Sequence, residues 1–183
     1  KRFGTAIAIL LLSVWPSGCE QIDRVMSSID TGTPVGCVFI GLDISGSFLH
    51  GKYWNDSLEF LANYIYGHLK GRAGLEVPHT LFVGTIGGVK AGEPKTFYPI
   101  QTFENSSVVE IHSKLKQLFP SNKENPFTDF NAFFEQISNL VQNKKLILKP
   151  ISIVLISDGQ PDIPGKKGDD RFRAIDIKPL EKL

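Results

Sequence analysis

Residues 35–42 read VGCVFIGL and are followed directly by residues 43–47, which read DISGS. The first stretch is a nearly continuous apolar run rich in β-branched residues, which is typical of a strand covered on both faces of a parallel sheet. The second stretch alternates one carboxylate with two hydroxyls across a turn that contains Gly46. This junction predicts a buried strand whose carboxyl end presents oxygen atoms.

Three further segments have the character of strands. Residues 80–86 (TLFVGTI) and residues 151–157 (ISIVLIS) are apolar runs of strand length, and the second also ends at an acidic residue. Residues 96–103 (TFYPIQTF) contain Pro99, which cannot donate to a sheet ladder. We therefore expect this segment at an edge of the sheet.

Helical segments separate these strands. Residues 53–69 carry apolar residues at spacings of three and four, and a similar pattern begins at about residue 129. Ser107 and Glu110 form the sequence of a capping box that opens another helix. Strands separated by helices predict an α/β fold: a Rossmann-like, doubly wound, mostly parallel sheet with an antiparallel edge strand. Function is then expected at the carboxyl ends of the strands.

Length and charge limit what the chain can be. Its 183 residues, 42% of them hydrophobic, can bury one sizeable core but are few for two domains. The net charge of +1 and the lack of a basic stripe argue against nucleic-acid binding. We expect a signal region at residues 1–19, a linker at 20–34 and a domain at 35–183. Cys37 is expected to be a small buried hydrophobe, and no disulfide framework is indicated.

The beginning of the chain has the layout of a secretory signal. Lys1 and Arg2 precede an apolar run at residues 6–15, which is too short to span a bilayer. The small residues before Cys19 resemble the bacterial lipoprotein signal, in which the cysteine is lipidated, although Pro16 stands where leucine is usual. Lipidation at Cys19, plain cleavage and a structural apolar strand remain as alternatives. We expect export to the periplasm or cell surface, with membrane contact only through such a lipid anchor.

Oxygen-bearing side chains from three segments are candidates for one metal site. Asp43, Ser45 and Ser47 follow the first strand, Thr128 precedes a helix, and Asp158 directly follows the strand at residues 151–157. Oxygen ligands suit Mg²⁺, with Mn²⁺ or Ca²⁺ as alternatives, whereas Zn²⁺ favours histidine and cysteine. The four histidines show no ligand spacing, so we expect them to be surface or packing residues.

Each candidate also has a plain structural interpretation. Thr128 or Asp129 can cap the helix that follows, and Ser47 can cap a helix of its own. Asp158, followed by a glycine, can belong to an ordinary turn, and Asp162 is expected to be solvated. The metal hypothesis depends on all three segments meeting at one edge of the sheet.

The three segments also carry a family resemblance. DISGS at 43–47, FTD at 127–129 and SDG at 157–159 resemble, in this order, the metal-ion-dependent adhesion site of von Willebrand factor type A domains. The order of predicted elements from residue 35 to residue 162 is similar as well. A domain of this family would continue after the strand at 151–157 with further strands and helices. We therefore expect a fragment of a longer protein whose C-terminal strands are missing.

The resemblance implies a role for each candidate. Ser45 and Ser47 would bind the cation directly, Thr128 would bind it directly or through water, and Asp43 and Asp158 would supply charge, often through water. An open coordination position would then accept a carboxylate from a protein partner. The implied function is adhesion through the metal and not catalysis.

Two other functions stay open at this point. One is a metal-assisted hydrolase or phosphoryl-transfer enzyme, and the other is a structural domain of the same fold without metal dependence. The sequence contains no GxxxxGK[ST] loop and no GxSxG elbow around Ser45 or Ser47, and no histidine or cysteine is placed as a base or nucleophile. We therefore expect a metal-dependent binding module held outside the cytoplasmic membrane.

Overall fold

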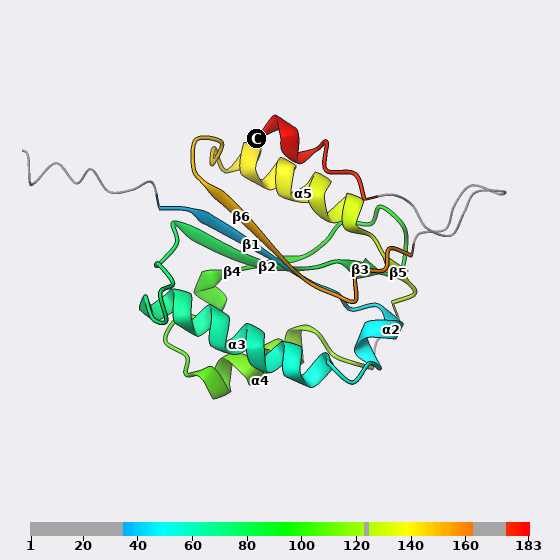
Figure 1. Ribbon diagram of the computed structural model, residues 1–183, viewed down its shortest axis with the longest axis horizontal. Helices are drawn as coiled ribbons and strands as arrows, with labels where there is room; N and C mark the ends of the chain where they lie inside the picture. Colours follow the sequence, from blue (N-terminus) through cyan, green and yellow to red (C-terminus); the bar gives the residue numbers. More distant parts are fainter. Residues whose placement is uncertain (1–34, 123–124, 163–174) are drawn as a thin grey trace, which may run out of the picture. The chain divides into compact units, whose positions relative to one another are not determined.

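A computed structural model of the chain describes residues 35–122, 125–162 and 175–183 (Figure 1). The expected signal region, its Cys19 and the expected linker lie outside the described residues. Within the described part, no helix is both long enough and apolar enough to cross a membrane.

A mixed sheet of four strands forms the centre of the fold. Its order is β4 (Phe97–Pro99), β2 (Thr80–Thr85), β1 (Cys37–Leu42) and β6 (Ile151–Ile156). β1 pairs in parallel with both β2 and β6, whereas β4 runs antiparallel to β2. The predicted α/β class, mostly parallel sheet and antiparallel edge strand with Pro99 are thereby confirmed, and the arrangement is compatible with a Rossmann-like fold.

Helices cover both faces of this sheet (Figure 1). α3 (Trp54–Lys70) and α4 (Val108–Leu118) lie on one face, and α5 (Phe130–Asn143) lies on the other. The predicted capping box is present, because the Ser107 side chain accepts from the Glu110 amide while the Glu110 carboxylate accepts from the Ser107 amide. The short elements are α2 (Gly46–Leu49), β3 (Gly87–Gly88), η1 (Ile100–Thr102), β5 (Phe127–Thr128) and η2 (Leu180–Lys182).

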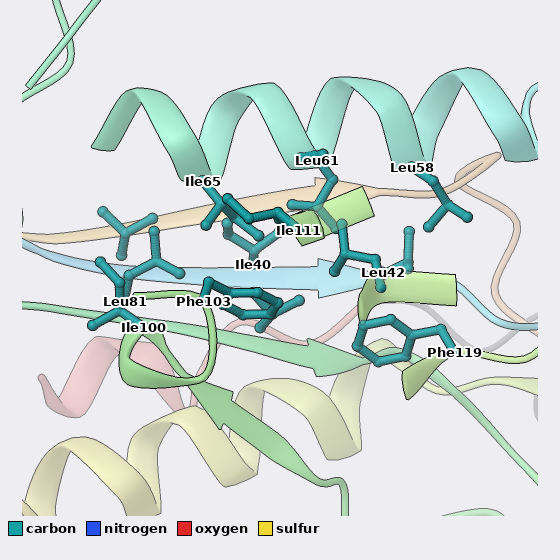
Figure 2. Packing of buried hydrophobic residues seen from close by; sticks show 14 of the residues in the cluster. Ile40, Leu42, Leu58, Leu61, Ile65, Leu81, Ile100, Phe103, Ile111 and Phe119 are labelled. Atoms are coloured by element: carbon teal, nitrogen blue, oxygen red, sulfur yellow. The ribbon is translucent and has the colours of Figure 1, made fainter. Parts of the chain in front are cut away.

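The larger core lies between the sheet and the helices α3 and α4 (Figure 2). Ile40 and Leu42 of β1 project onto Leu58, Leu61 and Ile65 of α3, and none of these five side chains is exposed. Removing a side chain of this size from water contributes about 1.5–3 kcal/mol. The apolar stripe of α3 therefore fixes this helix against the central strand.

The second core is aromatic and depends on glycine in the sheet. The Phe133 ring of α5 stacks on the Phe97 ring with 5.5 Å between centroids. A Cβ at Gly41 would lie 2.8 Å from two carbons of the Phe133 ring, and a Cβ at Gly84 would lie 3.4 Å from the same ring. The two glycines of neighbouring strands thus make the space that Phe133 fills.

β6 lies at the open edge of the sheet. In the part of the chain that the structure describes, β6 pairs with β1 on one side and with no strand on the other. Its side chains are half-buried or exposed, in contrast to β1, all of whose residues are buried. Cys37 of β1 is buried as a free thiol, as expected, and burial raises the pKa of this thiol above its ordinary value.

We predict that Gly41→Ala destabilises the fold by about 1–3 kcal/mol, because its methyl group overpacks the ring of Phe133. Urea unfolding of the wild type and the variant measures this difference. Gly46→Ala is the matched control, because no atom lies within 4 Å of a Cβ built there. Equal stability of the two variants would contradict the packing described for α5.

Candidate metal centre

Two of the predicted segments meet because β1 and β6 are parallel neighbours. Leu42 of β1 is in register with Ile156 of β6, so the residues that follow both strands emerge at the same edge of the sheet. The Asp43 amide donates to the Ile156 carbonyl over 2.9 Å and extends this pairing beyond the strands. Asp43 and Asp158 therefore begin neighbouring loops.

The carboxylate of Asp43 is completely buried, and each of its two oxygens accepts a hydrogen bond. Its Oδ1 accepts from the Ser45 amide over 2.8 Å, and its Oδ2 accepts from the Ser157 hydroxyl over 2.6 Å. The Ser157 hydroxyl in turn accepts from the Gly159 amide over 3.0 Å. Asp43 thus fixes the backbone of its own loop and ties it to the loop after β6. This arrangement suits a residue that supplies charge to a site without occupying a coordination position.

The outer part of the centre is a short chain of oxygens. The Ser45 and Ser47 hydroxyls are 3.2 Å apart, and the Ser47 hydroxyl donates to Asp158 Oδ2 over a further 3.2 Å. Two ligands at right angles, each about 2.1 Å from Mg²⁺, are about 3 Å apart. The spacing of these oxygens therefore fits neighbouring positions around one small cation. Ser45 is buried, whereas Ser47 and Asp158 are exposed, so this row of side-chain oxygens leads from the interior to the surface.

The charge balance at Asp43 also favours a cation. Burial raises the pKa of the Asp43 carboxyl above its ordinary value, and the nearby charge of Asp158 acts in the same direction. The hydrogen bonds from Ser157 and Ser45 oppose this rise. A buried carboxylate beside a second carboxylate is disfavoured in its charged form, and a divalent cation between them relieves that cost.

Thr128 reaches the same region through a small second sheet. It belongs to β5, which pairs antiparallel with β3 so that Thr128 faces Gly87. Gly87 packs directly on the first loop, because a Cβ there would lie 2.9 Å from the Ser45 amide nitrogen. On its other side, Thr128 exchanges two backbone hydrogen bonds with Asp162, of 3.0 and 3.2 Å. Thr128 precedes α5, as expected, but it lies in a two-residue strand and not in a loop.

The structure gives the helix N-cap positions to residues other than Thr128 and Ser47. Asp129 is the N-cap of α5, and its Oδ1 accepts from the Ala132 amide over 2.9 Å. The alternative in which Thr128 caps this helix is therefore wrong. Ser47 does not cap either, because it lies inside α2, whose N-cap is Ser45 with no side-chain capping bond.

The turn interpretation of Asp158 holds for one of its oxygens. Asp158 Oδ1 accepts from the Gln160 amide over 3.1 Å across a turn in which Gly159 has a φ of 77°. Its other oxygen accepts from Ser47, so the turn and the link between loops use different atoms. Asp162 is exposed, as expected.

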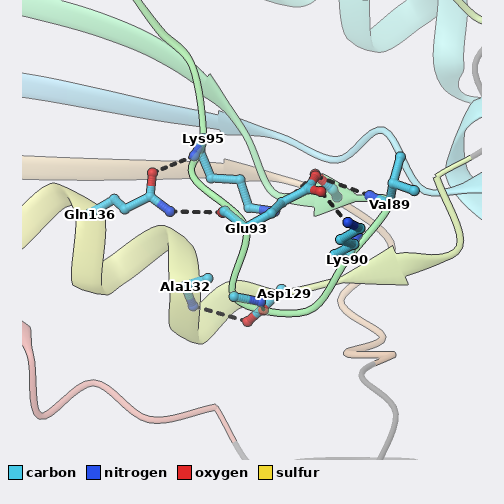
Figure 3. A network of polar contacts seen from close by, with 9 residues as sticks. Val89, Lys90, Glu93, Lys95, Asp129, Ala132 and Gln136 are labelled. Atoms are coloured by element: carbon cyan, nitrogen blue, oxygen red, sulfur yellow. Dashed lines mark hydrogen bonds and ion pairs between the residues drawn. The ribbon is translucent and has the colours of Figure 1, made fainter.

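A buried lysine supports the second sheet, and the sequence patterns did not indicate it (Figure 3). The Lys95 side chain is only 1% exposed, and its ammonium donates to the Gly87 carbonyl over 3.3 Å and lies 3.8 Å from Glu93 Oε1. The Glu93 carboxylate also accepts from the amides of Val89 and Lys90, each over 3.0 Å. The ion pair therefore folds the segment after β3 back onto that strand.

The segment after β3 is also hydrogen-bonded to α5 and to its N-cap residue. The Gln136 side chain accepts from the Lys95 amide and donates to the Glu93 carbonyl, and Asp129 Oδ2 accepts from the Gly92 amide over 2.8 Å. Asp129 thus caps α5 and holds this segment at once. The residue next to Thr128 is thereby anchored from two directions.

Hydroxyls and two carboxylates make up the candidate centre, which is a donor set for a hard cation. Over the part of the chain that the structure describes, no three His, Cys, Asp or Glu side chains gather into a metal-binding group. Any cation held here would therefore depend on the serine and threonine oxygens as well as on the acids. Comparison of the chain with protein-family models, curated proteins and solved structures found no match.

The stability that Lys95 contributes should depend on pH. Burial lowers the pKa of the Lys95 ammonium, while Glu93 and Asp129 oppose this shift. As pH rises through the native pKa towards the unfolded value of about 10.4, the unfolded chain binds more protons than the native one, so stability from this group rises. Wild type should therefore gain stability relative to Lys95→Met as pH is raised above neutrality.

Urea unfolding at a series of pH values measures this difference. Lys90→Met is the control, because the Lys90 side chain is exposed. A pH-independent difference for Lys95→Met would contradict the burial of a charged amine.

Proposed function

We propose that this chain is a binding module of the von Willebrand factor type A kind, and that its metal-ion-dependent adhesion site holds one Mg²⁺, with Mn²⁺ or Ca²⁺ as alternatives. One observation carries the proposal: buried Asp43 accepts from the Ser45 amide, the Ser45 and Ser47 hydroxyls contact each other, and the Ser47 hydroxyl donates to exposed Asp158. These residues come from two loops that are far apart in the sequence. Their oxygens have the spacing that a small cation requires.

Each residue has a distinct proposed role. The Ser45 and Ser47 hydroxyls bind the cation directly, and Thr128 adds a further oxygen from β5. Asp158 supplies charge from the exposed side, directly or through water. Asp43 supplies charge from the buried side of the centre, because its two oxygens already accept hydrogen bonds from Ser45 and Ser157.

The proposed ligand is a carboxylate of a protein partner. Mg²⁺ takes six ligands, so the protein oxygens leave positions for water or for an incoming group. Ser47 and Asp158 are exposed, which supports an opening towards solvent on this side. We propose capture of an acidic group through the metal, not catalysis, at a site held outside the cytoplasm by an exported and lipid-anchored N-terminus.

Calorimetry with Mg²⁺ should detect binding to the wild type, and Asp43→Asn should weaken it by about 10- to 100-fold because the buried charge is removed. Asp56→Asn is the matched control, since Asp56 is an exposed acid in the first turn of α3. No heat and no thermal stabilisation of the wild type at millimolar Mg²⁺ would sink the proposal.

Thr128 gives a second test that keeps the charge constant. Thr128→Val should weaken Mg²⁺ binding by about 10-fold, whereas Thr128→Ser should retain it because the hydroxyl remains. Equal affinity of both variants would remove Thr128 from the site. Metal-dependent hydrolysis of an ester or phosphate, lost in Asp43→Asn, would instead support an enzyme.

A further inference from the structure

Two consecutive glycines link two segments of the candidate metal centre. β3 consists of Gly87 and Gly88 alone, and it pairs with the two residues of β5. Gly87 faces Thr128 in this pairing, and a Cβ at Gly87 would lie 3.1 Å from the carbonyl carbon of Ile44, in the loop that carries Ser45. The position of β3 therefore sets the separation between the Ser45 loop and Thr128.

A strand of this kind does not hold its own position. Glycine loses more conformational freedom on folding than any other residue, and without side chains β3 buries no apolar group of its own. A ladder of two paired residues also provides few hydrogen bonds, and even a longer pair of strands is only marginally stable by itself. Groups outside the strand must fix its place.

Lys95 and Glu93, drawn in Figure 3, supply these groups. The Lys95 ammonium donates to the Gly87 carbonyl over 3.3 Å, and a Cβ at Gly88 would lie 2.6 Å from the same nitrogen. The ion pair thus occupies the space that a side chain at Gly88 would take. Because consecutive residues of a strand face opposite sides, β3 is held between the Ser45 loop on one face and the ion pair on the other.

Stability alone does not explain a lysine at this position. Taking an ammonium out of water is costly, and a buried ion pair is often no more stabilising than apolar side chains of similar volume. A methionine at position 95 would fill a similar volume without that cost. It would lack only the bond to the Gly87 carbonyl and the pairing with Glu93. The distinct contribution of Lys95 is therefore a defined position for β3.

We infer that Lys95 is a positioning residue of the candidate metal centre: by holding β3, it sets the separation between the Ser45 loop and Thr128, and thereby the preference for a small cation. The inference rests on the proposed function and adds what controls the selectivity of the site. Mg²⁺ requires ligands at about 2.1 Å in nearly octahedral geometry, whereas Ca²⁺ accepts longer distances and irregular geometry. A displaced β3 therefore weakens Mg²⁺ binding more than Ca²⁺ binding.

The first experiment tests the position of β3 without any metal. Hydrogen exchange of the Asp129 amide reports on it, because this amide donates over 3.2 Å to the carbonyl of Ile86, the residue directly before β3. In Lys95→Met this amide should exchange about 10-fold faster, since β3 loses a hydrogen bond from a charged donor. The Asp43 amide, which donates to the Ile156 carbonyl beside the main sheet, is the internal reference and should exchange as in the wild type.

The second experiment tests the link to the cation by calorimetry with Mg²⁺ and with Ca²⁺ at neutral pH. Lys95→Met should weaken Mg²⁺ binding by about 10-fold and Ca²⁺ binding by a smaller factor. A residue that only stabilises the fold would change both affinities by the same factor. Lys114→Met is the matched control and should change neither, because the partly buried Lys114 ammonium belongs to α4 and donates to the Thr102 carbonyl, not to β3.

A double variant tests whether Lys95 acts through Thr128. If Lys95 sets the separation of Thr128 from the Ser45 loop, its replacement should matter little once the Thr128 hydroxyl is gone. The variant that combines Lys95→Met with Thr128→Val should therefore bind Mg²⁺ as tightly as Thr128→Val alone, within about 2-fold. Losses that multiply in the double variant would mean that Lys95 acts independently of Thr128, and they overturn the inference.

The outcomes separate the two claims. A wild type that does not bind Mg²⁺ overturns the proposed function and the effect on affinity with it, while the exchange rates still show whether Lys95 holds β3. Unchanged exchange of the Asp129 amide in Lys95→Met overturns the inference alone. An equal loss of Mg²⁺ and Ca²⁺ affinity in that variant does so as well, because it assigns Lys95 to the stability of the fold.

Discussion

At the carboxyl end of the central strand, the carboxylate of Asp43 is removed from solvent and accepts hydrogen bonds from two different loops. Burying a charge is costly unless it is paired or fully hydrogen-bonded. Here the hydrogen bonds satisfy both oxygens, and the loops after β1 and β6 are fixed together as a result. The positions of Ser45, Ser47 and Asp158 follow from this constraint, since each lies within two residues of a group that contacts Asp43.

The packing of α5 determines how the third segment joins the other two. Gly41 and Gly84 leave room for Phe133, which sets the helix close to the sheet. The N-cap of that helix is Asp129, so the residue before it is delivered to β5 beside Gly87. Aromatic packing on one face of the main sheet thus bears on where Thr128 lies in the second sheet.

The sheet was predictable because its strands have strong local patterns. The apolar runs at β1, β2 and β6 and the proline of the edge strand identified the four strands. The parallel orientation of β1, β2 and β6 follows from the helices between them. β4 is shorter than expected, because the chain turns into a 3₁₀ helix at Ile100. β3 and β5 were missed because a strand of two residues has no periodicity to detect.

The sequence predicted that Asp43, Ser45, Ser47 and Asp158 lie near one another, and their hydrogen bonds agree, but it did not indicate which residues support them. Alternating polar residues after apolar strands identified Asp43, Ser45 and Ser47. The bond from Ser157 to Asp43 depends on the register between distant strands, which no local pattern records. The burial of Lys95 was equally hidden, because lysine is normally solvated and becomes buried only where tertiary structure provides partners.

The central claim is that loops from two parallel strands and one short strand enclose a single cation, and diffraction from crystals grown with Mn²⁺ tests it most directly. An anomalous difference map should show one peak bonded to the hydroxyls of Ser45 and Ser47, with Asp158 and Thr128 around it and Asp43 behind. A map with no peak at this edge of the sheet, or with its peak at another surface, would contradict the account.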